Sequence, residues 1–312
     1  MMKFGLFGIN MGPCSDPVTA VRVAQATEAA GFESVWTGEH IVLPDPQVPA
    51  SPVPSGIGHQ SRRRLAQHLD PKSPLLDPAV SLAFVAAHTQ RVKLGTGIII
   101  LPQRNPLVLA KELASVDVVS GGRLIFGLGV GFLKAEFDAL GIPFTDKGER
   151  AIEYLQAMLA IWTQDKPEYH GRFFAFRGVQ AWPRPAQSPH PPIVIGGHTP
   201  EAFRRALRHA SGWYGFALDV DETARCVAGL EQAARDLGRP GGLAGFEISV
   251  TPAVHLDADT VRRYADLGVG RLIPFKGGGE TELLHFCHQD WRYPDRSLLI
   301  RRRSYVNGWR RA

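Results

Sequence analysis

The chain has 312 residues, of which 44% are hydrophobic and 21% are charged, a composition that can form a sizeable core and excludes a disordered or fibrous protein. The formal net charge of +5 is spread along the chain, and no basic motif studded with aromatic residues accompanies it. We therefore expect no nucleic-acid partner, and a small anionic ligand explains the charge as well.

The sequence also lacks the signatures of export, membrane insertion and metal binding. The first residues, MMKFGLFGIN, do not contain the long apolar core of a signal peptide, and no later run reaches the roughly 18 apolar residues of a membrane span. Three cysteines, Cys14, Cys226 and Cys287, lie far apart without the spacing of metal ligands. We expect a cytoplasmic protein with reduced thiols, no disulfide framework and no metal site.

Short apolar strands alternate with helical segments along the chain. The strands are predicted at residues 3–9, 34–37, 92–100, 123–128, 193–195, 213–217, 246–251 and 270–275. The helices are predicted at residues 17–30, 78–89, 106–119, 147–163, 200–210, 221–237 and 258–267.

Four of these helices begin with a capping residue that is followed by proline. The side-chain oxygen of the first residue can accept a free helical N–H, while proline occupies a position where no N–H is needed. The four pairs are Asp16-Pro17, Asp77-Pro78, Asn105-Pro106 and Thr199-Pro200.

The alternation predicts a parallel sheet, and eight βα units in a chain of this length favour a closed (β/α)8 TIM barrel over an open doubly wound sheet. The predicted fold class is α/β, with residues 1–312 as a single domain. Two insertions interrupt the pattern: residues 43–77 after the second strand and residues 164–192 before the fifth, where EYHGRFFAF predicts a hairpin. Both leave from the carboxyl ends of strands, where barrel enzymes place their sites, and we interpret the first as a lid.

Two places near predicted strand ends combine unusual residues. The strand at 92–100 contains Gly95 and Gly97, which suit a bulge or the close approach of a ligand, or which reflect packing alone. The second strand ends with Glu39 and His40, an acid and an imidazole at the expected barrel mouth. His40 could transfer a proton or donate a hydrogen bond to a ligand, although such pairs are often only structural.

Three further segments could bind a ligand. The glycines of GLGVG at 127–131 lack the Gly-x-Gly-x-x-Gly spacing of a dinucleotide fingerprint, so we expect them instead to let a flat ring lie against the backbone. The segment IGGHTPE at 195–201 predicts a strand, a turn and a helix N-terminus, which is either a phosphate site or an ordinary βα turn. Arg62, Arg63 and Arg64, with Lys72, could meet a polyanionic group or form a solvated surface.

Together these segments resemble a known family. GFESVWTGEH, LGTGIIILPQRNPLVLAKELASVDVVSGGRLIFGLGVGF, EFDALGIPF, ERAIEYLQAMLAIWT, HGRFFAF and PPIVIGGHTPEAFRRALRHASGW closely resemble the luciferase-like monooxygenase superfamily. Within it the chain looks most like the oxidoreductases that use the deazaflavin coenzyme F420. The resemblance runs nearly continuously from residue 1 to about residue 217 and weakens afterwards. It implies a (β/α)8 barrel with the cofactor at the carboxyl ends of the strands.

The resemblance also implies roles for individual residues. It implies a non-prolyl cis peptide bond at Gly97-Ile98, behind the cofactor ring. The other implied positions are Glu39 and His40 near the ring, Val130 and Gly131 beside it, and Gly196, Gly197 and His198 around the cofactor phosphate.

One residue departs from the pattern of a family branch. Phe132 stands where the sugar-phosphate dehydrogenases of the superfamily have a glutamate acid, which argues against their substrate.

The resemblance implies coenzyme F420 as the cofactor, with FMN as the alternative. A deazaflavin has carbon in place of the reactive flavin nitrogen, so it transfers hydride and reacts poorly with oxygen. We therefore expect an F420-dependent oxidoreductase acting on a small organic substrate, with no membrane partner and with a homodimer left open. The alternatives are an FMN-dependent monooxygenase and a barrel that binds a flavin without turnover.

Overall fold

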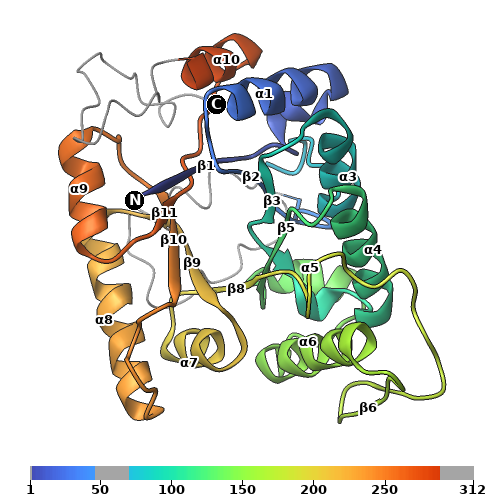
Figure 1. The fold of residues 1–312 in the computed structure, drawn as a ribbon. Helices are drawn as coiled ribbons and strands as arrows, with labels where there is room; N and C mark the ends of the chain where they lie inside the picture. Colours follow the sequence, from blue (N-terminus) through green and yellow to red (C-terminus); the bar gives the residue numbers. More distant parts are fainter. Residues whose placement is uncertain (1, 46–69, 289–312) are drawn as a thin grey trace.

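The computed structural model describes residues 2–45 and 70–288, and Figure 1 shows how their strands and helices are arranged. Neighbouring strands are parallel, and the pairing of β3 with β5 closes the sheet into an eight-stranded barrel. The predicted TIM-barrel fold is therefore confirmed. Its strands are β1 (Lys3–Phe7), β2 (Ser34–Thr37), β3 (Lys93–Thr96), β5 (Leu124–Gly129), β8 (Ile193–Gly196), β9 (Gly212–Leu218), β10 (Glu247–Pro252) and β11 (Arg271–Leu272).

The third predicted strand is interrupted near its end. It stops at Thr96, and a two-residue strand, β4 (Ile99–Ile100), resumes the pairing with β5. The peptide bond between Gly97 and Ile98 is cis, as predicted. The Gly97 N–H donates to the Thr37 carbonyl at 2.8 Å, which ties the interruption to β2.

The seven predicted helices are all present, with ends that differ by at most one residue from the prediction. They are α1 (Pro17–Ala29), α3 (Pro78–His88), α4 (Pro106–Val119), α6 (Lys147–Thr163), α7 (Pro200–His209), α8 (Val220–Asp236) and α9 (Ala258–Asp266). Among the described residues, sequence reasoning missed four short helical elements: the 3₁₀ helices η1 (Gly12–Ser15) and η2 (Leu101–Gln103), and the helices α5 (Lys134–Ala139) and α10 (Glu280–His288).

The predicted helix caps are confirmed. In each case the side chain of the capping residue accepts a backbone N–H from the first turn of the helix, which satisfies a donor that has no partner within the helix. Asp16 caps α1, Asp77 caps α3, Asn105 caps α4 and Thr199 caps α7.

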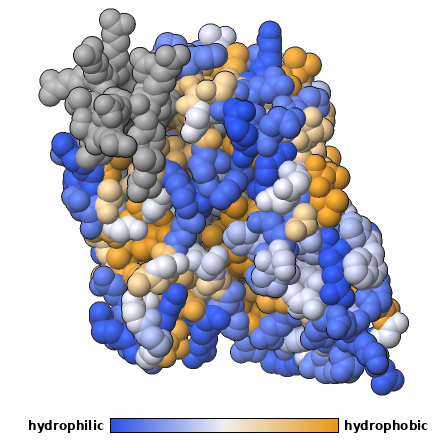
Figure 2. All heavy atoms as spheres, viewed as in Figure 1, coloured by the Kyte–Doolittle hydropathy of each residue, from blue (hydrophilic) through white to orange (hydrophobic). Residues whose placement is uncertain are grey.

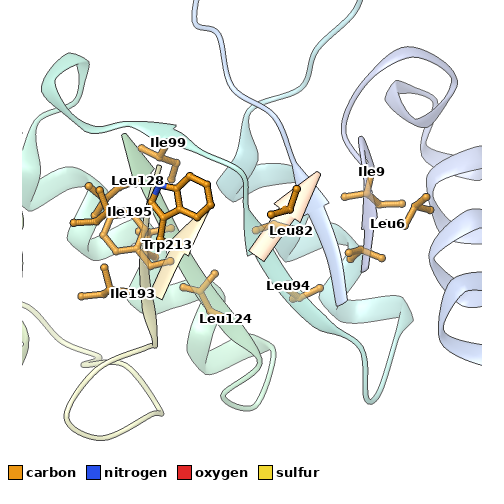
Figure 3. Close-up of a cluster of buried hydrophobic side chains, with 14 of the residues drawn as sticks. Leu6, Ile9, Leu82, Leu94, Ile99, Leu124, Leu128, Ile193, Ile195 and Trp213 are labelled. Carbon is orange, nitrogen blue, oxygen red and sulfur yellow. The ribbon is translucent and has the colours of Figure 1, made fainter. Parts of the chain in front are cut away.

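Two apolar layers lie on the two faces of the barrel strands. The outer layer packs strands against helices, and Figure 3 shows Leu94, Leu124, Ile193 and Ile195 among its side chains. The inner layer fills the barrel. Its buried residues are Phe7, Trp36, Ile125, Val194, Tyr214 and Ile273. Because successive side chains of a strand point to opposite faces, β1, β2, β5, β8 and β9 each contribute to both layers, which explains their nearly continuous apolar sequences.

The insertions differ in how much of them the structure describes. The predicted hairpin of the second insertion is present as β6 (Tyr169–His170) and β7 (Ala175–Phe176), which pair in antiparallel fashion. Arg62, Arg63 and Arg64 of the first insertion lie outside the described residues, and so does most of the lid predicted at residues 43–77.

Hydrophilic residues cover most of the face shown in Figure 2, with hydrophobic residues scattered among them. In residues 2–45 and 70–288, no helix is both long enough and apolar enough to span a membrane.

Candidate active site

The barrel mouth, at the carboxyl ends of the strands, carries apolar side chains above the inner layer. The ring of Phe7 lies 5.0 Å from that of Phe216 and 5.8 Å from that of Phe275, measured between centroids. Met11 and Ile98 pack against the same cluster. An apolar surface of this kind favours contact with the face of an aromatic ring system.

Ile98 occupies a position that depends on two glycines in neighbouring strands. A Cβ atom at Gly129 of β5 would collide with Cδ1 of Ile98, and a Cβ atom at Gly196 of β8 would lie 3.2 Å from that same atom. The absence of side chains at these two positions lets Ile98 extend over both strands. Contact of Gly97 and Ile98 with a cofactor stays a prediction.

His40 forms a pair with a residue that sequence reasoning did not select. Its Nδ1 lies 3.1 Å from Oε2 of Glu136 in α5, and Oε1 of Glu136 accepts the Ile41 backbone N–H at 2.7 Å. A carboxylate only accepts hydrogen bonds, so the imidazole proton lies on Nδ1. Within the described residues no hydrogen-bond partner contacts Nε2, which leaves that nitrogen available to a ligand.

The surroundings of this pair differ at its two ends. The side chain of Glu136 is fully buried, whereas that of His40 keeps 17% of its surface exposed. Phe132 packs edge-on against the imidazole, with 6.2 Å between the ring centroids. A buried carboxylate therefore fixes one side of the imidazole, and an apolar ring covers part of the other.

Glu39 lies in a buried ion pair. Its Oε1 accepts from Arg104, with the Nε contact at 3.0 Å, and its Oε2 accepts the Ile100 N–H. The same guanidinium donates to Oδ2 of Asp77 at 2.7 Å. Because both carboxylate oxygens of Glu39 already have partners, this geometry favours a role in holding the segment after the strand interruption.

Val130 and Gly131 follow β5 and lead toward α5. Gly131 has a φ of +69°, and a Cβ atom there would lie 2.6 Å from a methyl group of Ile100. Val130 is partly buried and packs against the outer layer. Both residues leave the strand at the barrel mouth, and contact with a cofactor ring stays a prediction for each.

The turn between β8 and α7 has the properties of an anion site. Gly197 has a φ of +123°, and a Cβ atom there would lie 2.8 Å from Cβ of Ala202. The carbonyl of Gly197 accepts from Nε1 of Trp213 at 2.7 Å. No acceptor among the described residues meets the backbone N–H of Gly197 or His198. Free N–H groups at a helix N-terminus fit a phosphate.

His198 belongs to this turn but supplies no positive charge. Its Nε2 accepts the Phe216 N–H at 3.3 Å, and its ring packs edge-on against Trp213. Burial of the imidazole lowers the pKa of His198 to about 4, so the ring is neutral at pH 7. A phosphate at Gly197 would therefore be held by backbone N–H groups, with His198 fixing the shape of the turn.

The site residues that the sequence analysis missed share one property. Glu136 and Arg104 act on predicted residues from positions far away in the chain, and nothing in their local sequence marks them. The only signal for Glu136 was its place in EFDALGIPF, one of the segments that carry the family resemblance.

The other titratable groups of the described residues do not form a metal site. Within residues 2–45 and 70–288, no three His, Cys, Asp or Glu side chains lie close enough together to hold a metal ion. Cys14, Cys226 and Cys287 are buried free thiols, and burial raises the pKa of both Cys14 and Cys226 to about 12.

Comparison with known proteins assigns the family. Residues 2–304 match the luciferase-like monooxygenase family, and this match extends beyond residue 217, where the resemblance noted in the sequence weakens. The chain is a luciferase-like protein. The apolar mouth and the Gly197 turn fit the flat ring and the phosphate that flavin and deazaflavin cofactors carry.

Similar luciferase-like proteins differ in cofactor. An uncharacterized protein of Mycobacterium tuberculosis is 30% identical over 270 residues, which is 86% of this chain and 90% of that protein. An FMNH2-dependent dimethylsulfone monooxygenase of Pseudomonas putida is 38% identical over 138 residues, 43% of this chain and 37% of that enzyme.

A solved structure with the same fold has the other cofactor in its name. It is the coenzyme F420-dependent tetrahydromethanopterin reductase of Methanopyrus kandleri, with a TM-score of 0.70 and 17% identity over 92% of this chain and 97% of that one. At this identity the likeness concerns the fold alone. Family membership is thus compatible with either F420 or FMN.

Proposed function

We propose that this luciferase-like protein is an F420-dependent oxidoreductase that transfers hydride between the deazaflavin and a small organic substrate. The observation that carries the proposal is the pair of His40 and Glu136 beside an apolar barrel mouth. Hydride removal from an alcohol requires a base for the hydroxyl proton, and the free Nε2 of an oriented imidazole can accept it; in the reverse direction the same nitrogen returns that proton to the carbonyl oxygen. The preference for F420 over FMN rests on the family branch that the sequence resembles.

In this proposal the cofactor phosphate is held by the free N–H groups of Gly197 and His198, in the turn that follows Gly196 at the start of α7. Ile98, Val130 and Gly131 lie against the ring. The bound deazaflavin supplies the carbon that gives or accepts hydride.

The residues that exchange the proton and orient the imidazole follow the ends of β2 and β5. His40 exchanges a proton with the substrate oxygen through Nε2, and Glu136 keeps that nitrogen in the correct tautomer. Glu39, predicted as catalytic, is assigned here to positioning, because Arg104 and Ile100 occupy its oxygens. Phe132 excludes water from one side of the imidazole.

The test is an equilibrium titration of the purified protein with F420 and with FMN, followed by absorbance. F420 should bind at least about tenfold tighter, a difference of about 1.4 kcal/mol. Equal affinities, or tighter binding of FMN, would overturn the assignment of F420.

An FMN-dependent monooxygenase is the second candidate, because the relative from Pseudomonas putida has an FMNH2-dependent activity in its name. Preferential binding of FMN together with oxygen consumption in the presence of a flavin reductase would favour it. A barrel that binds cofactor without turnover is the third candidate. For such a barrel we expect tight binding of the cofactor, and no oxidation of reduced F420 by any of a panel of aldehydes, ketones and enones.

A further inference from the structure

Two positive side chains from neighbouring helices meet at the first turn of α6. Lys147 is the first residue of α6, and Arg205 extends from α7. A Cβ atom at Gly148, the second residue of α6, would lie 2.9 Å from Nη1 of Arg205. α6 and α7 lie side by side in Figure 1. Along the chain, α6 follows the carboxyl end of β5 through α5, and α7 follows the carboxyl end of β8. The two cations therefore lie on the same side of the barrel as its mouth.

Neither cation has an anionic partner in an ion pair within the described residues. The acids at the start of α6, Asp146 and Glu149, pair instead with Arg172 at 3.3 and 3.5 Å. Lys147 has its ammonium 3.5 Å from the centroid of the Phe144 ring, which is a cation–π contact.

Arg205 also forms no ion pair among the described residues, although the charge of Glu201 acts on it. Glu201, one turn earlier in α7, pairs with Arg204 at 3.2 Å. The Nε atom of Arg205 is buried without a hydrogen-bond partner in the part of the chain that the structure describes.

This arrangement is unfavourable for an empty protein. Burial, and then the charge of Arg205, lower the pKa of Lys147 to about 8. The N–H groups in the first turn of α6 add a partial positive charge, and the side chain of the N-cap residue, Asp146, caps none of them. Buried polar groups and charges in proteins normally have partners. One anion could contact the Lys147 ammonium, the Arg205 guanidinium and the N–H groups at the start of α6 together.

We propose that Lys147, Arg205 and the first turn of α6 bind a phosphate or carboxylate group of a small molecule. This anion subsite is built on α6 and carries two formal positive charges, whereas the Gly197 turn offers backbone N–H groups and a neutral His198. The subsite goes beyond the proposed function, because it can serve a second anionic group of the cofactor or an anionic substrate.

Amine labelling with site-resolved mass spectrometry tests the subsite, with inorganic phosphate as the probe. In the purified protein the labelling rate of Lys147 should show a midpoint near pH 8. Phosphate should slow labelling of Lys147 by about fivefold or more and raise this midpoint, because an anion favours the charged amine. The exposed Lys166 serves as the internal reference and should be unaffected.

Variants of two adjacent arginines provide the matched comparison. Arg205→Met should abolish the protection of Lys147 by phosphate, and Arg205→Lys should restore part of it. Arg204→Met removes an arginine from the same helix and should leave the protection unchanged. Gly197→Val should also leave it unchanged, because the Gly197 turn lies outside the subsite. Equal protection of Lys147 and Lys166, or protection that survives in Arg205→Met, would overturn the proposal.

The same readout identifies the source of the anion. Protection by F420 and FMN but not by riboflavin assigns the subsite to the cofactor phosphate and would contradict its placement at the Gly197 turn. Protection by F420 alone assigns the subsite to the glutamyl tail. Protection by inorganic phosphate that persists when either cofactor is bound assigns it to the substrate. Inorganic phosphate alone decides whether the subsite exists. A negative result with phosphate therefore rejects the subsite without bearing on the assignment of F420 as the cofactor.

Discussion

The imidazole of His40 and the carboxylate of Glu136 lie 3.1 Å apart although 96 positions separate them in the sequence. His40 follows β2, and Glu136 lies in the short helix α5, which follows β5. The pair therefore exists only because the barrel brings the ends of these two strands together.

Substitutions in this pair should reduce turnover more than cofactor binding. His40→Asn should lower kcat by roughly 10²–10⁴, the usual contribution of a proton-transfer group. Glu136→Gln should have a smaller effect in the same direction and should shift the pH profile of kcat, because the amide no longer holds the imidazole as a carboxylate does. Stopped-flow kinetics with F420, together with the dissociation constant, measure both effects. A Glu136→Gln enzyme with an unchanged pH profile would contradict the positioning role.

Gly197→Val should weaken phosphate-bearing cofactors and leave riboflavin binding unchanged. The new side chain would approach Ala202 and block the N–H groups at the start of α7. The positive φ also costs stability, of the order of 1–3 kcal/mol.

Gly31→Val is the matched control for Gly197→Val. Gly31 has a φ of +83°, and a Cβ atom there would meet nothing within 4 Å. The control should therefore reproduce the strain without the effect on binding. If both variants lose cofactor affinity equally, the Gly197 turn is an ordinary βα connection.

The stability of the protein should depend on the titration of His198. The pKa is about 4 in the folded state and near 6.5 in the unfolded chain, so between these values the unfolded state binds more protons. The free energy of unfolding should thus fall as the pH falls through this window, by about 3 kcal/mol for this group at 1.36 kcal/mol per pKa unit.

Urea unfolding between pH 7 and pH 4 measures this dependence. His198→Gln keeps an acceptor for the Phe216 N–H but does not titrate, so its stability should fall less steeply than that of the unchanged protein. His170→Gln, at a side chain that is 64% exposed, should leave the dependence unaltered. Parallel curves for the unchanged protein and His198→Gln would be incompatible with a neutral buried imidazole.

Breaking the ion pair of Glu39 and Arg104 should destabilise the protein. Arg104→Met leaves a buried carboxylate without its charged partner, which typically costs about 3–5 kcal/mol. In the double variant Glu39→Gln and Arg104→Met the loss should be smaller than the sum of the two single losses, because neither charge remains alone. Denaturant unfolding of the three variants gives the coupling energy. Additive losses would show that the two side chains do not act as a unit.

The sequence was sufficient for the strands of the barrel, for its seven longer helices and for the geometry within single segments, but not for the four short helical elements. The caps at Asp16, Asp77, Asn105 and Thr199 are local, since each needs only the following three residues. Gly95 has a nonlocal reason: a Cβ atom there would collide with the indole of Trp36, so its role is packing inside the barrel.

The partners of the site residues could not be predicted in the same way. Glu39 was expected near the cofactor ring, which stays a prediction, and the direction of its side chain depends on Arg104, which lies 65 positions later. His198 was expected around the phosphate as part of its turn, but its hydrogen bond comes from Phe216, at the end of the next strand of the barrel. Such contacts depend on strand register and tertiary packing, which local patterns do not encode.

The position of Ile98 over Gly129 and Gly196 limits how this barrel mouth can change during evolution. A mutation that adds a methyl group at position 129 displaces Ile98, so it can be fixed only together with a smaller residue at position 98. Homologues should therefore show covariation among positions 98, 129 and 196. A larger residue at position 129 or 196 should occur together with a smaller residue at position 98. A new substrate preference that requires a wider or narrower mouth would then arise through paired substitutions, and single replacements at any of the three positions would be rare intermediates.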